Sequence, residues 1–360
     1  MQPVPYSPDE LTPRGFFPLL AGGQAPIYST PVTPRENFLA NLRGETPLWV
    51  PMFSDCKKFM PAIFPDNKPH GIVLEAAPFS REGLTGGKGM FNIPWVWEAQ
   101  VGGSTVVPGN PMIKEACELD TKLVWPEPAT WDWAGSAALN KEYLHTDFVR
   151  GTTIFCGFFE RLIALMDFQY AAIALIDEDD KPYIHRFFDR LCGVYEEMIV
   201  RIKKYYDLDL IEFHDDWGSQ RAPFFSLATV REMILPYMKR VVDCVHANGM
   251  IFELHCCGCN ADLTPAMIEA GVDAWAPQPS ANDTRAIFEK YGDRITIGMS
   301  CPLAPGSAEA DYIAWAKQFV DECVARPGMR SPYLFDMRTP LSFRETVYTL
   351  SRRKFCGESN

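Results

Sequence analysis

The feature that most constrains the fold is a regular alternation of short apolar runs and helical stretches in the second half of the chain. Each run has the length and flanking turn residues of a buried strand, and each following segment repeats its apolar residues at helical spacing. The expected strands are 210–214, 250–254, 272–276, 295–299 and 333–335, and the expected helices are 227–247, 262–270, 282–291, 308–325 and 341–353. Such alternation predicts parallel strands that are joined by right-handed helical crossovers.

The first half of the chain supplies further expected strands. Pro47–Phe53 and Phe148–Phe155 have the composition of buried strands, and Gly103–Val107 ends in a Pro-Gly turn. Helical segments follow at 156–167, 169–177 and 184–206. About three early strands and about five late units favour an α/β fold, a closed (β/α)8 TIM barrel, over an open doubly wound sheet. No G-x-G-x-x-G motif follows an early strand, as a dinucleotide-binding sheet requires.

The domain organisation expected from the sequence is an arm followed by one barrel. Residues 1–32 are rich in proline and turn residues, which predicts an N-terminal arm. Residues 33–360 are expected to form a single (β/α)8 barrel domain with long early loops in the Gly-, Pro- and Trp-rich stretch 54–145. The opening helix is predicted to begin after Thr33, because proline follows at the first helical position and Glu36 completes a capping-box pattern.

Net charge and cysteine content limit the expected partners and location. The formal net charge is −12, which argues against binding nucleic acid or an anionic membrane surface, since both require a basic face. No apolar run approaches the roughly 20 residues of a membrane helix, and the first residues lack the pattern of a signal peptide. The 11 cysteines are an odd number scattered over a long chain, unlike a disulfide scaffold. We therefore expect a cytoplasmic protein.

Polar residues gather where the first late strand ends, in the run His-Asp-Asp-Trp-Gly-Ser-Gln. In a barrel, catalytic groups lie at the carboxyl ends of the strands. Strand alternation places His214 and Asp216 on one face and Asp215 on the other. These three are candidate catalytic groups, with His214 or Asp216 also able to bind a metal and Asp215 able to act as an acid or base. Trp217 and Gln220 are candidate substrate-binding residues. The alternative is that an aspartate caps a turn and His214 is a core histidine.

The second late strand opens the stretch Met250–Asn260, and its carboxyl end carries a chelating pattern. Alternation places Glu253, His255 and Cys257 on one side of the strand. An imidazole and a thiol at this spacing fit a catalytic zinc site, which has three protein ligands and one open position. The expected third ligand is Cys301, with Asp216, His214, Glu253 and Cys259 as alternatives. Gln278, after the next strand, is a further candidate for substrate binding. The alternative is a buried pair followed by a turn.

Four segments carry a resemblance to a known family. They are Thr33–Glu45 (TPRENFLANLRGE), Gly157–Asp180 (GFFERLIALMDFQYAAIALIDEDD), His214–Gln220 (HDDWGSQ) and His255–Gly258 (HCCG). The chain resembles the uroporphyrinogen decarboxylase superfamily of (β/α)8 barrels, and in motif it is most similar to the branch of zinc-dependent methyltransferases that act with corrinoid proteins. Two features depart from these relatives: the arginine-rich motif of the decarboxylases is missing near the N-terminus, and no late cysteine occurs in Gly328–Arg338.

The resemblance implies a zinc-dependent methyltransferase that moves a methyl group between a corrinoid protein and a small-molecule or thiol acceptor. His255 and Cys257 would hold Zn²⁺, with Cys301 or a residue of 212–216 as the third ligand, and the corrinoid would be supplied by a partner protein. The alternative is a cofactor-independent decarboxylase of a tetrapyrrole or smaller carboxylate, with Asp215 or Asp216 as its charged group. Whether the chain forms a homodimer is left open.

Overall fold

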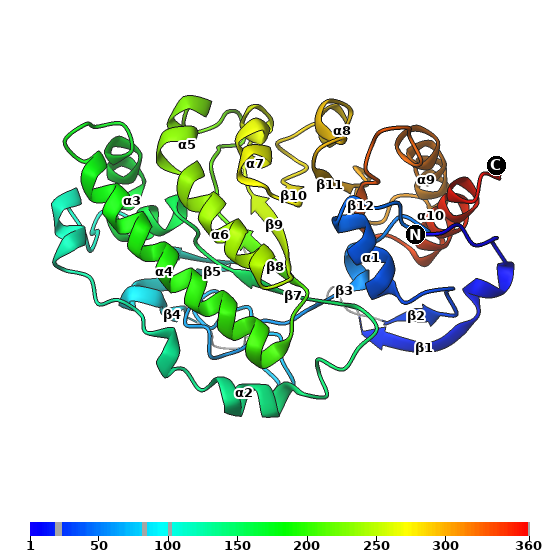
Figure 1. Cartoon of the computed structure of the whole chain (residues 1–360), viewed down its shortest axis with the longest axis horizontal. Helices are drawn as coiled ribbons and strands as arrows, with labels where there is room; N and C mark the ends of the chain where they lie inside the picture. The colour runs from blue at the N-terminus through cyan, green and yellow to red at the C-terminus, as the bar shows by residue number, and fades with distance from the viewer. Residues whose placement is uncertain (19–23, 81–84, 100–102, 359–360) are drawn as a thin grey trace. The chain divides into compact units, whose positions relative to one another are not determined.

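The computed structural model describes residues 1–18, 24–80, 85–99 and 103–358. The chain divides into two compact units, whose helices and strands are labelled in Figure 1. The first unit comprises Met1–Lys57, Asp147–Val149 and Asp273–Asn360, and the second comprises Lys58–Thr146 and Arg150–Val272.

The second unit is built on three neighbouring parallel strands, β7 (Val149–Ile154), β8 (Leu210–His214) and β9 (Ile251–Cys256). All three were predicted to within two residues at either end. The central strand β8 pairs with β9 so that Glu212 lies opposite Glu253 and His214 lies opposite His255. Because side chains alternate along each strand, this register brings the two histidines to the same face of the sheet.

Helices follow these strands, as the alternation predicted. The α-helices of the second unit are α2 (Trp133–Asn140), α3 (Phe159–Ala174), α4 (Lys181–Tyr206), α5 (Leu227–Met233), α6 (Leu235–Ala247) and α7 (Thr264–Ala270). Helices α4 and α6 pack side by side (Figure 1). Tyr195 of α4 packs edge-on against Phe213 of β8, with ring centroids 5.2 Å apart, so α4 is held to the sheet by its aromatic face.

Two helix breaks shape this unit. Helix α3 is interrupted at Asp167, whose backbone has φ 61° and ψ 159°, and the sequence predicted a break at this place. The expected helix 227–247 is instead two helices that meet at Ile234, whose φ of −114° distorts the helix between α5 and α6. Pro236 lies in the first turn of α6, where its missing N–H costs no hydrogen bond.

A small antiparallel sheet also belongs to the second unit. Its strands are β4 (Gly87–Lys88), β5 (Pro94–Glu98) and β6 (Gly103–Val106), in that order. The strand predicted at 103–107 is therefore present, but it pairs antiparallel with β5 and is not a barrel strand.

The first unit contains the later parallel strands and a hairpin. Its parallel strands are β10 (Ala274–Pro277), β11 (Thr296–Ser300) and β12 (Tyr333–Phe335), and its α-helices are α1 (Pro34–Leu42), α8 (Thr284–Tyr291), α9 (Glu309–Cys323) and α10 (Leu341–Phe355). Thr33 and Glu36 form the predicted capping box at the start of α1. The expected N-terminal arm contains an antiparallel hairpin of β1 (Pro13–Pro18) and β2 (Gln24–Tyr28).

The chain is a TIM-barrel-like α/β protein, but the closed eight-stranded barrel that we expected is wrong. Among the described residues, the strands of barrel type are seven, β7–β12 and the short β3 (Cys56–Lys58). The run Pro47–Phe53, predicted as the first barrel strand, forms only an isolated parallel bridge between Met52 and Leu334. Trp49 and Leu48 are instead buried in a cluster with Tyr348 of α10, so the apolar pattern reflected burial without strand pairing.

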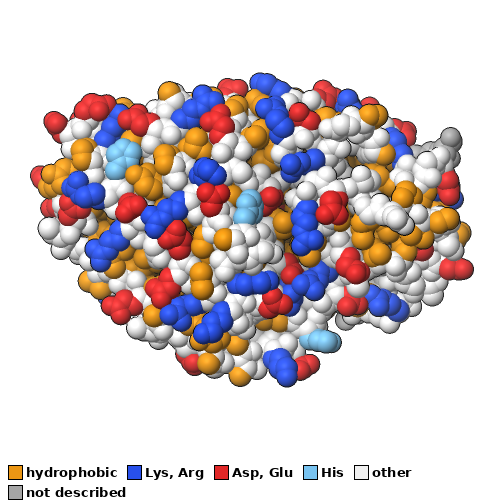
Figure 2. Space-filling model, viewed as in Figure 1, with side chains coloured by type: hydrophobic (Ala, Val, Ile, Leu, Met, Phe, Trp, Pro, Cys, Tyr) orange, Lys and Arg blue, Asp and Glu red, His pale blue; other side chains and the backbone are white. Residues whose placement is uncertain are grey.

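The surface carries charges of both signs. Figure 2 shows Lys and Arg side chains interspersed with Asp and Glu on the face in view. Among the described helices, none has the length and apolar character needed to cross a membrane.

Candidate metal centre

The register of β8 and β9 places two histidines side by side at the carboxyl ends of these strands. The rings of His214 and His255 have centroids 4.6 Å apart and are tilted by 30°. Both side chains are half-buried, so they are held by the surrounding structure and remain partly accessible. Neither sequence segment alone could show this pairing, because it depends on which residue of β8 lies opposite which residue of β9.

Four side chains converge at this point. One ligand atom each from His214, Asp216, His255 and Cys257 can be chosen so that all lie within 4.8 Å of one another. His255 Nε2 lies 3.1 Å from Cys257 Sγ, and the backbone N–H of Cys257 donates to Asp216 Oδ1 at 2.7 Å. Ligands of a tetrahedral zinc ion lie roughly 3.3–3.8 Å apart, given Zn–N and Zn–S bond lengths. Two imidazoles, a thiol and a carboxylate are all ligand types that zinc accepts, and atoms within 4.8 Å of one another would need to move only slightly to hold the ion.

The structure brings His255 and Cys257 together, and the role of Cys301, which belongs to the first unit, as third ligand stays a prediction. His255 and Cys257 belong to the converging group, and so do His214 and Asp216, which the sequence offered as alternatives for the third ligand. Cys301 follows β11 in the first unit and is not a member of this group. The group therefore has four donors without the late cysteine.

Replacing Cys301 by serine is expected to leave metal content unchanged. The matched replacement, Cys257→Ser, is expected to lower metal affinity by at least about tenfold, because serine is a poor substitute for a thiolate ligand. Titration of the metal-free variants with zinc against a competing chelator measures both affinities. Equal losses in the two variants would contradict a ligand set that includes Cys257 and excludes Cys301.

Glu160, which the sequence pattern did not single out, orients one of the histidines. It stands in the first turn of α3, and its Oε2 lies 2.9 Å from His214 Nδ1. A histidine that donates Nδ1–H to a carboxylate presents the lone pair of Nε2, which is the usual arrangement around a metal-binding histidine. The residue could have been found from its place, since it follows the end of the expected strand Phe148–Phe155 as a polar residue at a helix start.

Burial and charge set the protonation of the two histidines in opposite directions. Burial, reinforced by the charge of His214, lowers the pKa of His255 to about 4, so its imidazole is neutral at pH 7. Burial also opposes a charge on His214, but Glu160, Cys257 and Asp216 outweigh it and hold the pKa of His214 well above its usual range. Burial raises the pKa of Glu160 to about 7, so Glu160 and His214 act as a coupled pair around a shared proton.

Glu160→Gln is expected to lower metal affinity by about 10- to 100-fold while leaving the fold intact, because it removes the carboxylate that orients His214. Glu197→Gln is the matched control, since Glu197 forms an i,i+4 ion pair with Arg201 on α4 and does not belong to the metal-binding group. Zinc titration of both variants measures the difference. An unchanged affinity in Glu160→Gln would show that Glu160 does not support the site.

Two carboxylates, Glu212 of β8 and Glu253 of β9, lie opposite each other two residues before the histidines, and the buried Lys58 contacts both. Lys58 Nζ is 3.1 Å from Glu212 Oε2 and 3.9 Å from Glu253 Oε2. Thr153 of β7 donates a hydrogen bond to Glu212. Burial alone would raise the pKa of Glu212, but Lys58, His255 and Thr153 lower it to about 2. Glu212 therefore stays ionised beneath the histidines, and Lys58 is the cation that it shares with Glu253.

Asp215 has a different position from its neighbour Asp216. It is fully buried and accepts hydrogen bonds from the backbone N–H groups of Phe159 (3.3 Å) and Glu160 (2.9 Å) and from Trp217 Nε1 (2.8 Å). Asp215 thus caps the start of α3 and fixes the backbone that carries Glu160. The catalytic acid or base role expected for Asp215 remains a prediction, but its oxygens are already engaged by three donors.

The expected substrate-binding residues lie in three different settings. Trp217 is buried, with its indole N–H bound to Asp215. Gln220 is exposed on the loop that follows β8. Gln278 lies after β10 in the first unit, where its Nε2 donates to Ser280 Oγ at 3.0 Å. Of the three, Gln220 is the one with an exposed side chain near the end of a site strand.

The comparisons with known proteins show the fold and leave the family open. No protein-family model and no curated protein sequence matches the chain. Among solved structures, a methyltransferase from Methanosarcina mazei is similar over 90% of this chain and 99% of its own, with a TM-score of 0.59 and 15% sequence identity. A D-allulose 3-epimerase from Methylomonas sp. is similar over 58% of this chain and 69% of its own, with a TM-score of 0.37 and 13% identity. The chain therefore shares the fold of the Methanosarcina methyltransferase.

Proposed function

We propose that the protein is a zinc-dependent methyltransferase whose metal centre consists of His214, Asp216, His255 and Cys257. The observation that carries this proposal is the convergence of four ligand atoms within 4.8 Å at the carboxyl ends of β8 and β9. The fold shared with a protein described as a methyltransferase supports the reaction class. The residue pattern His255-x-Cys257, on which the resemblance to corrinoid-linked methyltransferases rests, lies within this centre.

Each side chain of the centre has a task that follows from its contacts. His255 is held neutral by burial and offers a lone pair, and Glu160 orients the ring of His214. Asp216 accepts the backbone N–H of Cys257 and so fixes the turn that carries the thiol. A zinc ion held by this set would supply Lewis acidity and favour the deprotonated form of a thiol acceptor.

The proposed donor is a methylated corrinoid carried on a separate protein, and the proposed acceptor is a small thiol. The transfer breaks the methyl–cobalt bond, leaves its electron pair on cobalt, and forms a methyl–sulfur bond from the electron pair of the thiolate. Four protein donors would be available to hold zinc, one more than the three protein ligands that a catalytic zinc site usually has. Asp216 already accepts the backbone N–H of Cys257, so His214, His255 and Cys257 would hold the ion and leave a position for the acceptor.

The decarboxylase alternative is less well supported by the contacts. Asp215 is fully buried and bound by three donors, and Asp216 belongs to the metal-binding group. Both aspartates are therefore already engaged in other contacts, which a catalytic role would require them to give up.

The proposal is tested by anaerobic incubation of metal-free and zinc-loaded protein with methylcobalamin and a panel of thiols, namely homocysteine, 2-mercaptoethanol and dithiothreitol. We expect zinc-dependent loss of methylcobalamin, followed by absorbance, and matching methyl thioether, followed by mass spectrometry. His255→Ala should abolish both. Zinc-loaded protein that transfers no methyl group to any of these thiols above the metal-free background would contradict the proposed reaction.

A further inference from the structure

A pocket of the first unit is lined by several cationic side chains, and we call it the arginine pocket. It has a volume of about 310 Å³, near the lower end of the range for small-molecule sites. Its walls are formed by residues 44–47 after α1, by the loop 325–331 between α9 and β12, and by the end of α10. The charged residues of its lining are Arg326, Arg330, Lys354 and Glu45. The lining therefore carries excess positive charge, although the whole chain has a net charge of −12.

A tight turn brings the two arginines to the same pocket. The residues Arg326-Pro327-Gly328-Met329 form a turn that is closed by a hydrogen bond from the Met329 N–H to the Arg326 carbonyl at 3.1 Å. Proline at the second position and glycine with φ 77° at the third are typical of a type II turn. Arg326 begins this turn and Arg330 follows it, so one short loop supplies two cationic side chains to the lining.

The guanidinium of Arg330 lies against the backbone of the opposite wall. A Cβ atom added to Gly44 would lie 3.1 Å from Arg330 Nε and 3.2 Å from Arg330 Cζ, so the guanidinium packs directly over this glycine. Arg330 is half-buried, and Arg326 is exposed. Among the residues that the structure describes, neither arginine takes part in an ion pair or in a side-chain hydrogen bond. Because arginine stays protonated in proteins, both side chains can offer charged donors to a ligand.

Lys354 adds a third cation in a fixed position. Its Nζ donates hydrogen bonds to the backbone carbonyls of Val320 and Asp321 in the last turn of α9, both at 2.7 Å. The carbonyls of a helix C-terminus carry only a partial negative charge, so they anchor the ammonium without cancelling its charge. An ammonium has three N–H donors, and one of them is left for a ligand.

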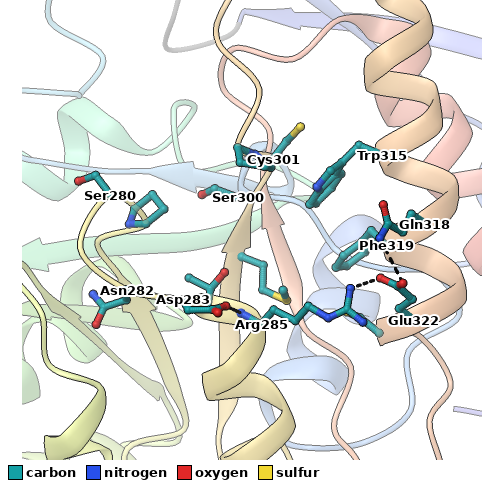
Figure 3. Close-up of a pocket in the computed structure, with 15 residues that line it drawn as sticks. Ser280, Asn282, Asp283, Arg285, Ser300, Cys301, Trp315, Gln318, Phe319 and Glu322 are labelled. Carbon is teal, nitrogen blue, oxygen red and sulfur yellow. Dashed lines mark hydrogen bonds and ion pairs between the residues drawn. The ribbon is translucent and has the colours of Figure 1, made fainter.

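A larger pocket of the same unit differs in the state of its cation. This pocket has a volume of about 530 Å³ and is lined by the loop 279–285 and by α9. Its arginine, Arg285, forms an ion pair with Glu322, which Figure 3 shows as a dashed line. The positive charge there is matched by a carboxylate of the chain itself, whereas Arg326 and Arg330 have no such match among the described residues.

We propose that the arginine pocket binds a phosphate group, either as inorganic phosphate or as the phosphate monoester of a small molecule. A phosphate monoester carries close to two negative charges at pH 7 and has three strong acceptor oxygens. The three cations of the lining match this charge, and a forked guanidinium can bind two of the oxygens at once. A carboxylate has a single negative charge and would leave more of the positive charge of the lining unmatched.

The site is separate from the proposed methyl transfer. The loop 325–331 precedes β12, so it lies at the amino end of that strand, whereas barrel enzymes place their catalytic groups at the carboxyl ends. None of the residues of the metal-binding group lines the arginine pocket. The phosphate site therefore stands or falls independently of the methyltransferase reaction.

Calorimetric titration of the full-length protein with three anions tests the proposal. Inorganic phosphate and glycerol 3-phosphate are expected to bind, and acetate, which carries one charge, is expected to bind at least about tenfold more weakly. Tighter binding of glycerol 3-phosphate would support a phosphate monoester as the ligand, and tighter binding of inorganic phosphate would support the free ion. The proposal is overturned if neither phosphate binds at concentrations up to about 10 mM, or if acetate binds as tightly as both.

Arginine variants tie the binding to this pocket. Arg330→Gln is expected to weaken phosphate binding at least about tenfold, and Arg330→Lys, which keeps the charge but loses the fork, to weaken it less. Arg285→Gln is the matched control and should leave phosphate binding unchanged, because Arg285 lines the other pocket and pairs with Glu322. The proposal is overturned if a folded Arg330→Gln variant binds phosphate as tightly as the original protein, or if Arg285→Gln weakens binding equally.

Discussion

The double variant His255→Ala/Cys257→Ser is expected to lose metal binding, with zinc affinity lowered by more than about 100-fold. Removing a side chain that only orients a metal ligand lowers metal affinity by up to about 100-fold. Removing the ligands themselves is expected to lower it further. The remaining pair, His214 and Asp216, cannot form a catalytic zinc site of three protein ligands. The loss is measured by zinc titration of metal-free protein against a competing chelator.

The matched control for this variant is Cys259→Ser. Cys259 is half-buried on the same loop but does not belong to the converging group, so its replacement is expected to leave zinc affinity within about twofold of the original. Circular dichroism should show that all the variants remain folded. Zinc binding that survives in the double variant, or that is lost equally in Cys259→Ser, would contradict the assignment of ligands.

Lys58→Met is expected to cost about 3–5 kcal/mol of folding free energy in the metal-free protein. It removes the cation that two buried carboxylates share, and breaking a buried ion pair on one side leaves uncompensated charge in the interior. Methionine keeps a similar length, so the main change is the loss of charge. Urea denaturation at neutral pH measures the difference in the free energy of unfolding.

The pH dependence of this loss has a defined sign. In the original protein the pKa of Glu212 is lowered to about 2, below the value of about 4.3 in an unfolded chain. The stability that ionised Glu212 contributes is therefore present above about pH 4.3 and disappears as the pH falls through about 2. The difference in free energy of unfolding between Lys58→Met and the original protein should be largest at neutral pH and should become smaller under acid conditions.

Lys239→Met is the control for the loss of a lysine. Lys239 is exposed and pairs with Asp243 along one helix, so its replacement should change the free energy of unfolding by less than about 0.5 kcal/mol. The account is contradicted if Lys58→Met and Lys239→Met change the free energy of unfolding equally. It is also contradicted if the loss in Lys58→Met stays the same at low pH.

The sequence predicted the parts of the site that depend on local pattern. Alternation along β8 predicted that His214 and Asp216 share a face, and the structure places both in the metal-binding group. The same rule predicted the pairing of His255 with Cys257 along β9. Asp216 and Cys257 lie just beyond the ends of β8 and β9, and the hydrogen bond between the Cys257 N–H and Asp216 ties the two segments together there.

The parts that depended on register or on distant contacts could not be predicted. The position of His214 opposite His255 is set by the pairing of β8 with β9, and the contact of Glu160 with His214 is set by the packing of α3. Cys301 was offered as the third ligand because it follows a late strand, and this stays a prediction, since a strand end alone does not tell which strand supplies the remaining donor. The expected strand Pro47–Phe53 failed for a similar reason, since its apolar residues are buried by packing.

The most direct test of the metal centre is elemental analysis of protein purified without a metal-chelating tag, after dialysis against zinc and removal of unbound metal. The ligand set predicts about one zinc ion per chain in the original protein and in Cys301→Ser, and almost none in His255→Ala/Cys257→Ser. The proposed metal centre is contradicted if the original protein holds no zinc after this treatment, or if the double variant holds as much zinc as the original.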